Sequence, residues 1–249
     1  MSDSHESIVQ VPRNYPDVAG VRLETEFEKF LENPTTQSME VITGLIALGT
    51  RQGLVAVGRI AQAVFKGKMY EQMAEEWRQL RKAGKMPENI GREKRGLYTW
   101  AELMKIIDDD CPDEDRLEAL KAAFYGVNRV KEGDSEKILE YQLWQITKEL
   151  TSGDVLLLKA IHERVNTPQG NKANEWEKNI ADQTGFGLVE LVQRHEKHLV
   201  DLLLLTKRGG YDNNAISVTN NRLTYLGVQL CKNIEQYRLD LNSSFSEGS

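Results

Sequence analysis

The sequence predicts a mainly α-helical protein: a helical amino-terminal domain, then a carboxy-terminal module with three helices, a small β-hairpin and a closing helix. Three observations support this. Apolar residues recur at helical spacing along most of the chain, as in Met69, Met73 and Trp77. Prolines number only 6 in 249 residues, so long helices can continue without interruption. Near the end, Ile216 and Val218 alternate with polar neighbours beside glycine and asparagine turn residues, which is typical of a half-buried strand.

The predicted organisation has four parts. Residues 1–19 carry acids where a signal peptide needs bases, and we expect a flexible leader there. Residues 20–150 form a helical bundle domain, and residues 151–241 form the carboxy-terminal module. The polar residues 242–249 are expected to be a flexible tail.

The composition limits the possible functions. A hydrophobic content of 40% with 28% charged residues is ordinary for a soluble globular protein. The net charge of −6 argues against a general nucleic-acid binder, although residues 151–241 balance 11 acids with 11 bases. Cys111 and Cys231 stand far apart and in no metal-ligand spacing, which suits a reducing compartment. We therefore expect a cytoplasmic protein.

Helical patterns divide residues 20–150 into several segments. The expected helices cover residues 20–32, 38–68, 69–84, 99–109, a stretch after Pro112, and 134–150. Thr99 and Glu102 have the spacing of a capping box, in which each side chain bonds the other's backbone N–H. Thr151 and Thr224 are candidate caps of two later helices.

The segment 38–68 is close to apolar, yet Gly44, Gly49, Gly53 and Gly58 recur inside it. Each glycine costs a helix interior about 1 kcal/mol relative to alanine, and close helix–helix approach is the usual compensation. One interpretation is a buried bundle helix. The alternative is a self-association face or a membrane-surface helix, because basic residues such as Arg59 interrupt the apolar run. Those bases make a membrane-spanning helix a poor fit.

The carboxy-terminal module has the element order of a winged helix-turn-helix domain. Three helices with a tight middle turn are followed by a predicted hairpin, with strands at 202–207 and 215–219, and by a last helix after Thr224. The stretch "LTYLGVQL" resembles the end of MarR-like winged helix-turn-helix domains. The whole chain also resembles a group of uncharacterised bacterial proteins, through "PDEDRLEALKAAF" and "LTSGDVLLLKAIHE". The second resemblance implies a bacterial source and a fold, without an activity.

The MarR-like resemblance implies double-stranded DNA as a possible partner, because in such domains the third helix enters the major groove and the wing touches phosphates. The candidate DNA-binding residues are Gln193, Arg194 and Lys197 on the third helix and Lys207, Arg208 and Arg222 on the wing. Glu190, Glu196 and Asp201 dilute the positive field on which such binding depends. A structural or protein-binding wing therefore stays open beside DNA binding.

The sequence contains no pattern that indicates an enzyme, a cofactor or a metal. His195 and His198 stand at i, i+3, but no third ligand is evident, and a polar helix surface explains them. No nucleophile motif or phosphate-binding glycine loop occurs. We therefore expect a non-enzymatic bacterial regulatory or interaction protein with a winged-helix module. The alternative is a protein-binding or self-associating component, in stress or phage defence, acting through helix 38–66. Membrane-surface binding by that helix is the least favoured interpretation.

Overall fold

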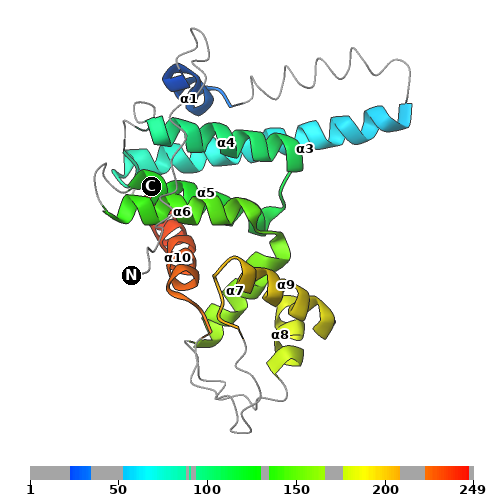
Figure 1. The fold of residues 1–249 in the computed structure, drawn as a ribbon. Coiled ribbons are helices and arrows are strands. Elements are labelled where there is room, and N and C mark those ends of the chain that lie inside the picture. Colours follow the sequence, from blue (N-terminus) through cyan, green and yellow to red (C-terminus); the bar gives the residue numbers. More distant parts are fainter. Residues whose placement is uncertain are drawn as a thin grey trace, which may run out of the picture.

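The computed structural model describes residues 23–34, 53–87, 90, 94–129, 135–165, 176–207 and 222–246. These residues form a mainly helical fold (Figure 1). The helices are α1 (Leu23–Glu32), α3 (Gly53–Lys82), α4 (Lys94–Asp110), α5 (Glu114–Arg129), α6 (Ser135–Glu149), α7 (Ser152–Val165), α8 (Trp176–Thr184), α9 (Val189–Asp201) and α10 (Tyr225–Ser246).

Helix α5 is the centre of the packing. Its residues from Ala119 to Asn128 are all buried, so it contacts neighbours on every side. It packs against α4, α6, α7 and α10. Asp113 begins the helix, since its side chain accepts the Arg116 N–H at 3.1 Å. The predicted helix after Pro112 is confirmed.

Helix α10 packs against helices from both the amino-terminal and the carboxy-terminal parts of the sequence. It packs against α3 and α5 from the amino-terminal half and against α7 from the carboxy-terminal third. Thr224 caps it, because its hydroxyl accepts the Gly227 N–H at 3.1 Å, as predicted. Gly227 lies so close to the Leu204 carbonyl that a side chain would collide with this backbone oxygen. The helix continues to Ser246, within the part of the sequence assigned to the tail.

An aromatic cluster fills the core beneath α1. Trp77 of α3 stacks on Phe124 of α5, with ring centroids 4.5 Å apart. Phe27 and Phe30 of α1 pack on Trp77 and on Trp100 of α4. All five side chains are buried, so α1, α3, α4 and α5 share one apolar core.

The predicted β-hairpin is wrong as a description of this fold: no β-strand occurs in the part of the chain that the structure describes. Leu204 and Leu205 donate their backbone N–H groups to the Leu199 carbonyl, at 2.9 and 3.2 Å, so the chain after α9 forms a helix-terminal turn. An antiparallel bridge follows between Leu205 and Leu223. The second predicted strand, 215–219, lies outside the described residues. The described fold is all-α, and the winged-helix prediction is not supported.

Two smaller predictions also need correction. The sequence assigned residues 38–68 and 69–84 to two helices, but residues 53–82 form the single helix α3, and residues 83 and 84 form the turn after it. Thr99 and Glu102 form no capping box, because α4 already begins at Lys94. The Thr99 hydroxyl instead donates to the Arg95 and Gly96 carbonyls, at 3.0 Å each. A hydroxyl inside a helix can bond the preceding turn, so the pattern alone did not locate the helix start.

Candidate interaction site

The predicted DNA-binding residues of the third helix lie on the outer surface of α9. Gln193, Arg194 and Lys197 are all exposed. Gln193 donates to Glu177 of α8 at 3.3 Å, so its amide is already engaged within the protein. Lys207, after α9, is exposed as well. DNA binding through the exposed cations Arg194, Lys197 and Lys207 stays a prediction.

Arg222 has a structural role in this fold. Its guanidinium forms an ion pair with Glu196 of α9 and donates to the Thr206 carbonyl at 2.7 Å. The Arg222 side chain is only 16% exposed and that of Glu196 only 7%. The ion pair with Glu196 therefore neutralises the charge of Arg222. It also links α9 to the residues beside the Leu205–Leu223 bridge. Arg208 lies outside the described residues.

His195 and His198 share one buried carboxylate, which the sequence did not indicate. Asp154 of α7 lies 2.9 Å from His195 Nδ1 and 2.8 Å from His198 Nδ1. Since an ionised carboxylate can only accept hydrogen bonds, both Nδ1 atoms donate to it. Thr151 completes the site: its N–H and its hydroxyl donate to Asp154 at 2.8 and 2.6 Å. Within the described ranges, no three metal-ligating side chains come together.

The protonation of Asp154 controls how firmly α9 is held on α7. Burial alone raises the pKa of Asp154, but hydrogen bonds from Thr151 and from the two histidines outweigh it and hold the pKa below its ordinary value. The ionised carboxylate therefore stabilises the fold above about pH 4, where the unfolded chain's aspartates are also ionised. This stabilisation is lost as the pH falls through the lowered pKa of the folded protein.

Asp154→Asn is expected to lower the free energy of unfolding at pH 7 by about 2–3 kcal/mol, because it removes the charge that four donors bind. The loss should shrink as the pH is lowered below about 4. Urea unfolding between neutral and acidic pH measures both effects. Asp182→Asn, at an exposed position on α8, serves as the matched control. Equal profiles for the two variants would contradict the assigned role of Asp154.

Two of the four predicted interaction glycines are among the residues that the structure describes. Gly53 is the first residue of α3 and Gly58 lies within it, while Gly44 and Gly49 lie outside the described residues. Figure 1 shows the amino-terminal part of α3 extending beyond the end of α4. From here on, residues 53–65 are called the projecting segment. Except for Arg59 and Gln62, every residue of this segment is apolar or glycine.

The projecting segment exposes large apolar side chains where it leaves the body of the protein. Val64 is 45% exposed and Phe65 is 50% exposed. Burial begins only further along, at Gly67, Met69 and Tyr70. The exposure of Val64 and Phe65 does not fit the buried bundle-helix interpretation at these two positions, whereas the burial of Gly67 fits it. Two exposed apolar side chains on a protruding element make this end of α3 a candidate interaction site.

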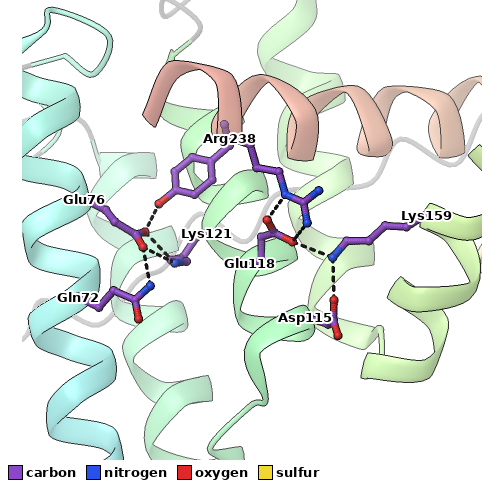
Figure 2. A network of polar contacts seen from close by, with 8 residues as sticks. Gln72, Glu76, Asp115, Glu118, Lys121, Lys159 and Arg238 are labelled. Carbon is purple, nitrogen blue, oxygen red and sulfur yellow. Dashed lines mark hydrogen bonds and ion pairs between the residues drawn. The ribbon is translucent and has the colours of Figure 1, made fainter. Parts of the chain in front are cut away.

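The second half of α3 is anchored by a buried polar cluster. Lys121 of α5 donates to both carboxylate oxygens of Glu76, at 2.9 and 2.7 Å, and Gln72 donates to Glu76 at 2.8 Å (Figure 2). The Tyr237 hydroxyl of α10 donates to the same carboxylate. Burial and the neighbouring Glu76 raise the pKa of Tyr237 well above its ordinary value, so the hydroxyl keeps its proton. The cluster fixes α3 to α5 and α10, which gives the projecting segment a rigid base.

A second polar cluster joins α5, α7 and α10. Lys159 of α7 lies 2.8 Å from Asp115 and 2.7 Å from Glu118, and Arg238 of α10 pairs with the same Glu118 (Figure 2). Burial raises the pKa of Glu118, but hydrogen bonds from Arg238 and Lys159 lower it below its ordinary value. The cluster links α7 and α10 to α5. It is a structural arrangement, because each charged group already has its partner within the chain.

Sequence reasoning selected the glycines of the projecting segment and missed Val64 and Phe65. The available signal was the absence of any acid between Glu40 and Glu71, in a chain with a net charge of −6. Such an interruption in the charge pattern indicates a segment with a surface role distinct from the rest. Asp154 was also missed, although it follows Thr151 at the capping-box spacing.

Among the described residues, no helix is both long enough and apolar enough to cross a bilayer. Comparisons of the chain with protein-family models, with curated proteins and with solved structures found no match.

Proposed function

We propose that this protein is a non-enzymatic interaction protein that binds another protein chain through the projecting segment of α3. The exposure of Val64 and Phe65 on this segment is the observation that supports the proposal. An apolar helix face gains free energy when it enters a complementary apolar surface, at about 25 cal/mol per Å² buried. The anchored second half of α3 holds the face in place, which lowers the entropic cost of binding.

Charge favours a protein partner whose surface combines apolar and acidic groups. Residues 53–68 carry Arg59, Lys66 and Lys68 and no acid. Free Cys111 and Cys231 favour a reducing compartment, and we place the protein in the cytoplasm.

Photo-crosslinking at Phe65 tests the proposal. Phe65 is replaced by benzoylphenylalanine in the full-length protein, which is then irradiated in its source cells. Covalent adducts of defined mass are expected, because a bound partner lies against this side chain. The control carries the same replacement at Ile138 of α6, which is 59% exposed. The same adducts at both positions, or none at position 65, would show that the projecting segment is not the binding site.

A further inference from the structure

We draw no further inference here: the strongest candidate, the exposed apolar side chains of Leu203 and Tyr225 between the end of α9 and the start of α10, carries none because nothing in the structure shows what covers them.

Discussion

Replacing Lys121 by methionine is expected to lower the free energy of unfolding by about 3–5 kcal/mol. Lys121 is 6% exposed and donates two hydrogen bonds to Glu76, which is also 6% exposed. Without the ammonium group, the carboxylate stays buried with only the neutral donors Gln72 and Tyr237. The cost therefore comes mainly from an uncompensated buried charge. Urea unfolding at pH 7 measures it.

The double variant Glu76→Gln with Lys121→Met should recover most of this loss. Replacing both members of a buried ion pair by neutral groups of similar volume is often close to neutral in stability. Lys105→Met, at an exposed position on α4, controls for the substitution itself and should change stability by less than about 0.5 kcal/mol. If Lys121→Met costs no more than the control, the cluster does not anchor α3. If the double variant is as unstable as the single one, lost packing rather than charge explains the effect.

Truncation of Trp77 to alanine is expected to cost about 3–5 kcal/mol, because it leaves a large cavity where four helices meet. Trp77 has no exposed surface and stacks on Phe124. Trp77→Phe keeps an aromatic ring on Phe124 and should cost clearly less. The urea concentration at the midpoint of unfolding should fall. The m-value, which is the dependence of the unfolding free energy on urea concentration, should stay constant, as for a change in stability alone.

Tyr225→Ala provides the contrast for Trp77, since this tyrosine is 71% exposed at the start of α10. Its removal should change stability by less than about 0.5 kcal/mol. A loss below about 1 kcal/mol for Trp77→Ala would show that the aromatic cluster is not the main core of this half of the protein.

Several elements could be predicted from the sequence because their signals are local. A helix bonds residues four apart, and its caps bond residues two or three apart, so Asp113, Thr151 and Thr224 mark their helices within a few positions. The same local signals failed at Thr99, where a threonine and a glutamate at the right spacing lie inside α4. There, Glu102 binds Trp144 and Lys148 of α6 instead, at 2.7 and 2.8 Å.

The candidate site was only half predictable. The sequence indicated that the segment before Met69 was apolar, glycine-bearing and free of acids, which is a property of composition. It did not indicate that the described part of this segment projects, since that depends on where α4 ends beside α3 in space. The predicted hairpin failed for a related reason. The glycine turn after residues 202–207 suggested a strand there, but the backbone N–H groups of Leu204 and Leu205 bond back to the Leu199 carbonyl.

By itself, the sequence determined the helical class, several helix starts and the unusual charge pattern before Met69, because periodicity and capping act over a few residues. The tertiary structure decided which charged side chains are paired within the chain and which are available to bind a partner. Arg222 is taken up by Glu196, His195 and His198 by Asp154, and Lys121 by Glu76. These partners stand 26 to 45 positions apart. Packing of the apolar core brings such residues together, and no local pattern records the pairing.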